Sequence, residues 1–134
     1  MTHRVEFADT DMAGIIHFSS YFRYMEVTEH AFFRSLGLSI TGTEGIGWPR
    51  VHVECDFKLP LRFEDEVEVE LTIAELRSKL ISYSYECWKI ASERLLVATG
   101  KITTVAVSPD VNGDMKATVI PDQVVQLLKP LVTH

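Results

Sequence analysis

A long helix with apolar side chains on most of its sides is the feature that most constrains this chain. Residues 19–36 show helical periodicity, and one stripe of the predicted helix carries Tyr21, Tyr24, Met25, Thr28, Phe32 and Leu36. Further apolar residues make the stripe wider than the face of a surface helix, namely Phe22, Val27, Ala31 and Phe33. We therefore expect this helix in the core, with Ser19 or Ser20 as its N-cap and Gly37 as its C-cap.

The chain beyond this helix alternates apolar and polar residues with the period of a β-strand. A first strand is predicted from residue 51, and its apolar positions are Val51, Val53, Cys55 and Phe57. Residues 66–73 alternate most cleanly, with glutamates on one face and, on the other, Val67, Val69, Leu71 and Ile73. Residues 80–91 and 94–108 supply two more strands joined by a connection of hairpin length. Such alternation predicts a sheet with one face in the core and one in water.

Shorter segments complete the outline: a strand over residues 3–8, a loop over 9–14, a glycine-rich loop over 41–47, a turn over 108–114 and a helix over 122–128. A run of strands with one long helix is typical of an α+β fold. One antiparallel sheet wrapped around one helix buries the apolar surface of both elements. We expect the four long strands in antiparallel succession within a single domain, residues 1–134, because this length supports one core.

Composition excludes several classes of protein. The formal net charge of −6 argues against a nucleic-acid-binding protein, which needs a basic surface. The chain has neither a signal-peptide pattern nor an apolar run long enough to cross a bilayer, so we expect a cytoplasmic protein without a membrane partner. Cys55 and Cys87 fall in predicted strands, and we expect reduced, buried thiols.

The loop over residues 9–14 holds two carboxylates, Asp9 and Asp11, just before the helix. An Asp in a loop often only stabilises a turn. Here the apolar residues that follow would place Asp11 near an apolar surface, and the N–H groups of a helix N-terminus can stabilise an anion or a developing oxyanion. The spacing of Asp9, Asp11 and His17 matches no zinc or calcium site, so we expect no metal. No serine-nucleophile or nucleotide-binding motif is present, and no cofactor is expected.

The segment "FADTDMAGIIHFSSYFRYMEVTEHAFFRSLG" closely resembles the N-terminal signature of the hotdog-fold acyl-CoA thioesterases of the 4-hydroxybenzoyl-CoA thioesterase type. In that family, D-x-D-x-x-G-I-V leads into the central helix. The segment "FKLPLRFEDEVEVEL" is similar to the family's next strand-turn-strand, and the remaining strands follow in matching order. The resemblance implies an antiparallel sheet wrapped around one long central helix, and a thioester hydrolase that releases a carboxylic acid and coenzyme A.

The resemblance also implies roles for single residues. Asp11 matches the catalytic carboxylate, which acts as a nucleophile or as a base that activates water, and the sequence leaves both routes open. Phe18 matches the position whose backbone N–H stabilises the oxyanion at the helix start. Gly14 would permit a close backbone approach, while Asp9 would be structural. Some relatives carry a histidine that assists the chemistry; His17 here stands one position early, so we expect it to face solvent or pack instead.

The same resemblance implies substrate-binding residues. Tyr21 matches a tyrosine near the active-site helix, although core packing accounts for it equally well. Arg77 and Lys79 match basic residues that approach the nucleotide and pyrophosphate of coenzyme A, and Ser78 stands where a second arginine can occur. Other candidate basic residues cannot be ranked from the sequence: Arg23, Arg50, Lys58 and Arg62.

In this fold the active site forms where two subunits meet, and an open edge strand favours pairing with a second copy. We therefore expect a homodimer or a homotetramer. Three alternatives to an acyl-CoA thioesterase stay open: a thioesterase acting on acyl carrier protein, a noncatalytic module that binds acyl thioesters, and a hydratase or dehydratase. The last is disfavoured because Asp11 and His17 do not have the spacing that it requires.

Overall fold

The computed structural model describes residues 1–38 and 45–133, so the predicted loop over 41–47 lies partly outside the described residues. The described residues form seven strands and two α-helices: β1 (Thr2–Arg4), α1 (Phe18–Ser35), β2 (Arg50–Phe57), β3 (Glu66–Leu76), β4 (Leu80–Ile90), β5 (Arg94–Val105), β6 (Val107–Pro109), β7 (Met115–Ala117) and α2 (Asp122–Leu128). Two short 3₁₀ helices accompany them, η1 (Phe7–Asp9) and η2 (Lys129–Leu131). The α+β class is thus confirmed. No helix within the described part is long and apolar enough to cross a membrane.

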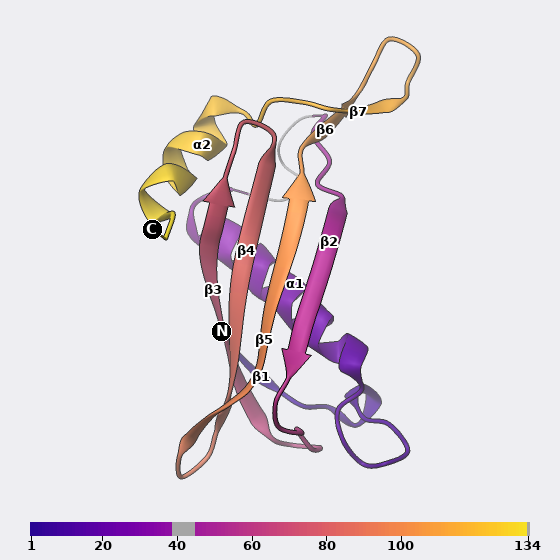
Figure 1. Ribbon diagram of the computed structural model, residues 1–134, viewed down its shortest axis with the longest axis vertical. Coiled ribbons are helices and arrows are strands. Elements are labelled where there is room, and N and C mark those ends of the chain that lie inside the picture. Colours follow the sequence, from indigo (N-terminus) through magenta and orange to yellow (C-terminus); the bar gives the residue numbers. More distant parts are fainter. Residues whose placement is uncertain (39–44, 134) are drawn as a thin grey trace. The chain divides into compact units, whose positions relative to one another are not determined.

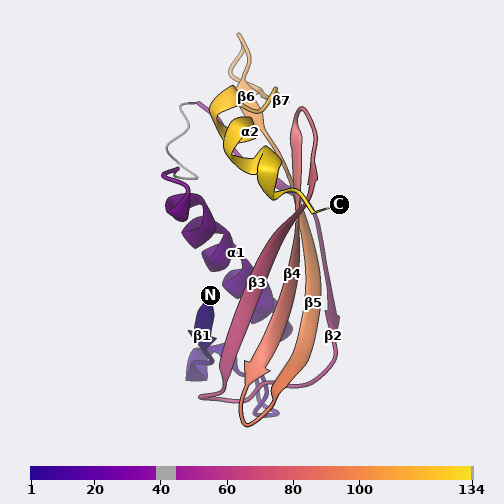
Figure 2. The ribbon, with the colours of Figure 1, turned by 90° about the vertical axis from the view of Figure 1, so that its left-hand side faces the viewer.

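Five strands form one sheet in the order β1-β3-β4-β5-β2, while β6 and β7 pair separately (Figure 1). The expectation of simple succession is wrong for β2, which lies beside β5 and not beside β3. Past the end of β2, the N–H groups of Lys58 and Leu59 both donate to the carbonyl of Val97 on β5, at 2.8 and 3.2 Å. At the other edge, β1 runs antiparallel to β3, with His3 opposite Val67 (Figure 2).

Two predicted strand boundaries were wrong. The strand over residues 3–8 ends at Arg4, because the N–H of Glu6 donates to the Asp9 carboxylate and the N–H of Asp9 returns to the Glu6 carbonyl, which closes the turn η1. The strand over 94–108 is divided at Ala106, whose N–H bonds to the carbonyl of Lys79. The turn over 108–114 is the tip of the β6–β7 hairpin, of which β7 was not predicted.

The chain divides into two compact units, each of which has its own core. The first consists of Met1–Ala31, Cys55–Leu71 and Tyr85–Gly100, and the second of Phe32–Glu54, Thr72–Ser84 and Lys101–His134. In the first unit, the ring of Tyr21 on α1 lies 5.4 Å from that of Phe57, and the ring of Tyr24 stacks on His3 at 4.9 Å. In the second unit, the ring of Phe33 meets Tyr83 edge-on at 6.4 Å. Each unit therefore packs its own part of α1 against its own strands.

The two ends of α1 are capped differently from each other. The helix begins at Phe18, so Ser19 and Ser20 lie inside its first turn and neither is the N-cap, contrary to the prediction. His17 takes that position, and its Nδ1 accepts the N–H of Ser19 at 3.3 Å. At the other end, Gly37 has φ +77° and donates to the carbonyl of Arg34, while Leu38 donates to Phe33. This Schellman pattern confirms the glycine cap.

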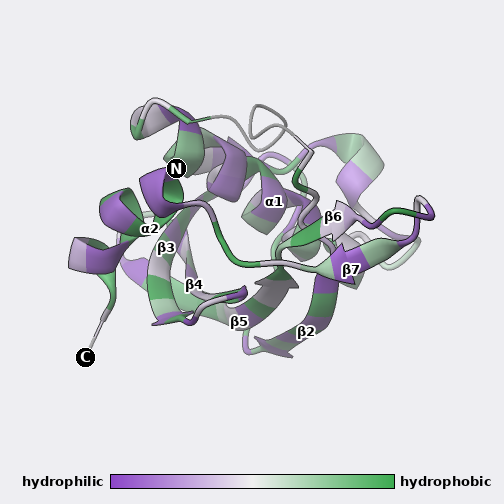
Figure 3. Cartoon of the chain, turned by 90° about the horizontal axis from the view of Figure 1, so that it is seen from above, coloured by the Kyte–Doolittle hydropathy of each residue, from purple (hydrophilic) through white to green (hydrophobic). Residues whose placement is uncertain are grey.

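Burial follows the predicted alternation in β3 but not in β2. In β3, Val67, Val69 and Ile73 are buried while the intervening glutamates reach solvent. Figure 3 shows the corresponding alternation of hydrophobic and hydrophilic residues along the strands. In β2, Val51 and Val53 are 59% and 47% exposed, because this strand lies at the edge of the sheet. The edge strand therefore leaves apolar side chains uncovered.

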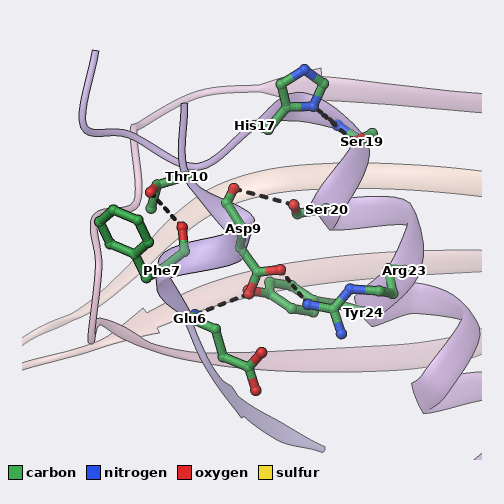
Figure 4. A network of polar contacts seen from close by, with 9 residues as sticks. All are labelled: Glu6, Phe7, Asp9, Thr10, His17, Ser19, Ser20, Arg23 and Tyr24. Carbon is green, nitrogen blue, oxygen red and sulfur yellow. Dashed lines mark hydrogen bonds and ion pairs between the residues drawn. The ribbon is translucent and has the colours of Figure 1, made fainter. Parts of the chain in front are cut away.

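The buried carboxylate of Asp9 joins η1 to α1 (Figure 4). Its Oδ2 accepts the Tyr24 hydroxyl at 2.6 Å and the Glu6 N–H at 2.9 Å, and its Oδ1 pairs with the guanidinium of Arg23. The Tyr24 ring also stacks on His3, so β1 reaches the same cluster. The sequence predicted that Asp9 stabilises the loop. In the structure its side chain also bonds to the N-cap residue of η1 and to α1.

Opposing effects act on the pKa of Asp9. Burial raises the pKa of this carboxyl, but the hydrogen bonds from Tyr24, from the Glu6 N–H and from Arg23 together hold it below its ordinary value of 3.8. Burial and the hydrogen bond to Asp9 raise the pKa of Tyr24, which keeps its hydroxyl protonated as a donor. Asp9 is therefore an ionised acceptor at neutral pH.

We expect Asp9→Asn to lower the free energy of unfolding at pH 7 by about 1–3 kcal/mol, because the substitution leaves buried donors poorly paired. A carboxylate whose folded pKa is lowered stabilises the protein above its unfolded pKa, and this contribution is lost as pH falls through the folded value. Urea unfolding of both proteins from pH 7 to below pH 3.8 should show the difference shrinking on acidification. Burial lowers the pKa of His3 and the Asp9 charge opposes this, so the substitution also changes the titration of His3, and the contribution of Asp9 is read from the acidic end of the curve. A difference independent of pH would contradict this role.

Candidate active site

The loop between η1 and α1 is closed at its base. The N–H of His17 donates to the carbonyl of Asp9 at 2.7 Å, and Thr10 and Ile16 form an antiparallel bridge. Outside the loop, the N–H of Ile16 donates to the carbonyl of Leu61 at 2.7 Å. These bonds fix the loop to α1 and to the segment that precedes β3.

Asp11 lies within this closed loop and is exposed. Its N–H donates to the carbonyl of Ile15 at 2.8 Å, and its Oδ1 accepts the N–H of Ala13 at 2.8 Å and that of Ile15 at 3.4 Å. Only Oδ1 takes part in these bonds. The arrangement holds the carboxylate in place from one side and leaves Oδ2 available to another group.

Gly14 has a backbone conformation that favours glycine. It has φ +79°, where glycine is favoured, and its N–H donates to the carbonyl of Asp11. A Cβ built at this position would meet nothing closer than 3.9 Å, namely Nη1 of Arg62. The turn geometry therefore favours glycine at this position, and the close backbone approach stays a prediction.

Asp11 lines a cavity of about 610 Å³ in the first unit. The remaining lining is mostly apolar and aromatic: Ile15, Ile16, His17, Phe18, Tyr21, Phe57, Lys58, Leu59 and Pro60. Three of the predicted site residues, Asp11, Phe18 and Tyr21, thus meet at one hollow. Gly14 does not line it, but lines a neighbouring hollow that also includes Asp11.

Phe18 is the first residue of α1, so its N–H has no partner within the helix. Among the described residues, no acceptor outside the helix takes this N–H either. The N-terminus of α1 is also the positive end of its dipole. A donor and a partial positive charge therefore lie at the cavity that contains Asp11.

His17 and Tyr21 meet the cavity in different ways. His17 is exposed, its Nδ1 lies 2.7 Å from the hydroxyl of Ser19, and its ring lies 4.5 Å from Phe18. Tyr21 is only 2% exposed, and burial raises the pKa of its hydroxyl. Tyr21 is thus both a core residue and a cavity wall, the two roles that the sequence could not separate.

Arg77 and Lys79 lie in the turn between β3 and β4, in the second unit. Neither lines the cavity of Asp11. Arg77 pairs with Glu75 at 3.3 Å and lines a different hollow of about 510 Å³ with Ser78 and Lys129, among others. Lys129 was not identified from the sequence.

The side of the cavity formed by residues 57–60 was mostly not predicted from the sequence. Phe57, Leu59 and Pro60 were not proposed for the site, and Lys58 was named only among unranked basic residues. The backbone bond from Ile16 to Leu61 brings this wall to the loop. That contact joins segments far apart in the sequence, and no local motif signals it. Within the described ranges, no three His, Cys, Asp or Glu side chains are grouped so that they could hold a metal ion.

Comparison with known proteins places the chain in a family. The family model described as the thioesterase-like superfamily matches residues 5–128. A protein of Aquifex aeolicus is 35% identical over 128 residues, covering 94% of each chain. A 1,4-dihydroxy-2-naphthoyl-CoA hydrolase of Rippkaea orientalis is 26% identical over 131 residues, covering 96% of this chain and 93% of its own. The solved structure of a gentisyl-coenzyme A thioesterase has a TM-score of 0.82 and 29% identity, covering 96% of this chain and 98% of that one.

These matches extend over nearly the whole chain and confirm the predicted resemblance at the level of the superfamily. The antiparallel sheet with a helix packed against it is the arrangement that the resemblance implied. The chain belongs to the thioesterase-like superfamily and has its hotdog fold.

Proposed function

We propose that this chain is an acyl-CoA thioesterase that hydrolyses a thioester to a free carboxylic acid and coenzyme A, with Asp11 as the acting group. The observation that carries the proposal is the cavity at which the Asp11 carboxylate and the N-terminus of α1 meet. Relatives whose names specify CoA thioesters as substrates support the reaction class. The mostly apolar lining suits an apolar acyl group.

The proposed chemistry needs an anion and an oxyanion donor. With the thioester carbonyl oxygen at the Phe18 N–H, negative charge developing on that oxygen would be stabilised by the N–H and the helix dipole. Asp11 either removes a proton from water as it attacks the carbonyl carbon, or attacks that carbon itself to give a mixed anhydride. The C–S bond then breaks and the thiolate leaves. In the second route water hydrolyses the anhydride and regenerates Asp11.

Asp11→Asn tests the assignment, because an amide can still accept the Ala13 N–H yet cannot act as base or nucleophile. We expect turnover of acyl-CoA, followed by thiol release, to fall by about 10²–10⁴-fold with folding unchanged by circular dichroism. Asp114→Asn, in the exposed β6–β7 turn, is the matched control. Burial raises the pKa of Cys55 to about 11 and that of Cys87 to about 12, so the protein's own thiols should react slowly with the reagent.

Wild-type turnover by Asp11→Asn would remove Asp11 from the mechanism. Wild-type protein that turns over no aliphatic, aromatic or carrier-protein thioester, yet binds them, would instead favour the noncatalytic module. Preference for carrier-protein thioesters would show that the substrate is acyl carrier protein and not acyl-CoA. Hydroxylamine distinguishes the two chemical routes, since it traps an aspartyl anhydride as a hydroxamate on the enzyme.

We further propose that Arg77 and Lys79 bind phosphates of coenzyme A. Their charges stand in the β3–β4 turn of a chain whose net charge is otherwise negative, and Lys129 lines the same hollow as Arg77. Arg77→Gln with Lys79→Gln should raise the KM for acyl-CoA by about 5- to 10-fold with little effect on kcat. The same acyl group on N-acetylcysteamine, which lacks the nucleotide, should show no change. Arg94→Gln, which removes an exposed arginine paired with Glu68 and Glu70, serves as the control.

We also propose that the working form is a homodimer or larger. Support comes from the hollow beside the active site, about 740 Å³ in volume, where Phe7, Met12 and Phe63 are 77%, 106% and 50% exposed. This hollow includes Asp11, so a second copy that covers it would also enclose the reacting group. The exposed edge strand β2 offers a further surface for pairing. The cytoplasmic location stays a prediction from the sequence.

Sedimentation tests this assembly, because a single chain has a mass of 15.2 kDa. We expect wild-type protein to sediment at twice or four times that mass, and Met12→Glu with Phe63→Glu to shift it toward the monomer and lower turnover. Val111→Glu, which alters a fully exposed apolar side chain in the β6–β7 turn, should change neither property. A fully active wild-type monomer would refute the proposal.

A further inference from the structure

Asp9 contacts the machinery of the active site through its backbone as well as through its side chain. Its carbonyl accepts the N–H of His17 at 2.7 Å and the hydroxyl of Ser20 at 3.2 Å. Figure 4 shows this carbonyl facing the first turn of α1, while the carboxylate faces Arg23 and Tyr24 on the next turn. One residue is thereby fastened to two successive turns of the helix.

The position of Asp11 depends on these contacts. Asp11 follows two residues after Asp9, and the His17 N–H that closes the loop belongs to the residue just before Phe18. Within the loop, Asp11 bonds only to neighbouring backbone groups, at Ala13, Gly14 and Ile15. Asp9 therefore holds the strand side of the loop to α1, and the helix in turn carries the oxyanion donor proposed above.

We infer that Asp9, held by Tyr24 and Arg23, is a positioning residue that sets the Asp11 carboxylate relative to the Phe18 N–H. The inference rests on the proposed function. Catalysis by an anion and an oxyanion donor requires both within a fraction of an ångström of the productive geometry, and a small displacement lowers the rate far more than it weakens substrate binding. Tyr24 and Arg23 act only through Asp9, since neither lines the cavity.

Tyr24→Phe tests the inference with the smallest change, because it removes the hydroxyl that donates to Asp9 at 2.6 Å and keeps the ring. We expect kcat for acyl-CoA to fall by about 10-fold or more with KM changed less than about 3-fold, measured well below the unfolding temperature. Asp9→Asn should show the same split more strongly. Thr103→Val is the matched control, because it removes a buried 2.8 Å hydrogen bond to Ser82 in the second unit and should leave kcat unchanged.

Two further variants separate positioning from general stabilisation. Arg23→Lys should retain most of kcat because it keeps a cation beside Asp9, whereas Arg23→Gln should not. In an Asp11→Asn background, Tyr24→Phe should have no further effect on kcat, because the group that it positions is gone. If Tyr24→Phe and Asp9→Asn keep kcat within twofold of the wild type, the inference is wrong.

Hydrogen exchange provides a readout that needs no turnover. The N–H groups of Ala13 and Ile15 bond to the Asp11 carboxylate, so they report its position. Their exchange should accelerate in Tyr24→Phe and not in Thr103→Val. Unchanged exchange would overturn the coupling even if the wild type proved inactive on every thioester. An inactive wild type with accelerated exchange would refute the proposed function and leave the coupling intact.

Discussion

The burial of one side of α1 is the constraint on which the rest of the site depends. Tyr21, Tyr24 and Met25 are almost completely removed from water, which gives a large favourable contribution to folding. A tyrosine buried in this way must still satisfy its hydroxyl. For Tyr24 the partner is Asp9, so packing of the helix also determines where the N-terminal segment lies. The same helix thus contributes buried apolar surface and a specific hydrogen bond to Asp9.

The local patterns in the sequence predicted the elements well. The helical stripe located α1 to within one residue at each end, and residues 122–128 form α2 as expected. Alternation identified β3, because one face of that strand is buried. The same rule misjudged β2, since a period of two shows which residues share a face but not whether that face is covered. The position of β2 beside β5 depends on long-range pairing that no local pattern records.

The site was predictable to the extent that it is contained in one segment. The loop, Asp11, Phe18 and Tyr21 lie close together in the sequence, and they meet at one cavity. Leu59 and Pro60 come from a distant segment and were not predicted, and Lys58 from the same segment was named without being placed at the cavity. Ser19 and Ser20 have the chemistry of N-caps, yet His17 occupies that position, because the bond from its N–H to Asp9 determines where the helix begins. Residue preference alone could not choose among the three polar residues on either side of Phe18.

The bonds that close the base of the loop, between Asp9 and His17, do not restrict which side chain stands at its tip. Between Asp9 and His17, the tip carries Met12, which is fully exposed and whose side chain has no role in the closing bonds. Substitutions at such a position can accumulate without disturbing the anchors on either side. A lineage could therefore change what the hollow beside the cavity presents to a partner, while Asp11 stays where the closing bonds of the loop hold it. The tip of the loop can therefore vary in sequence while the bonds at its base keep the loop in place.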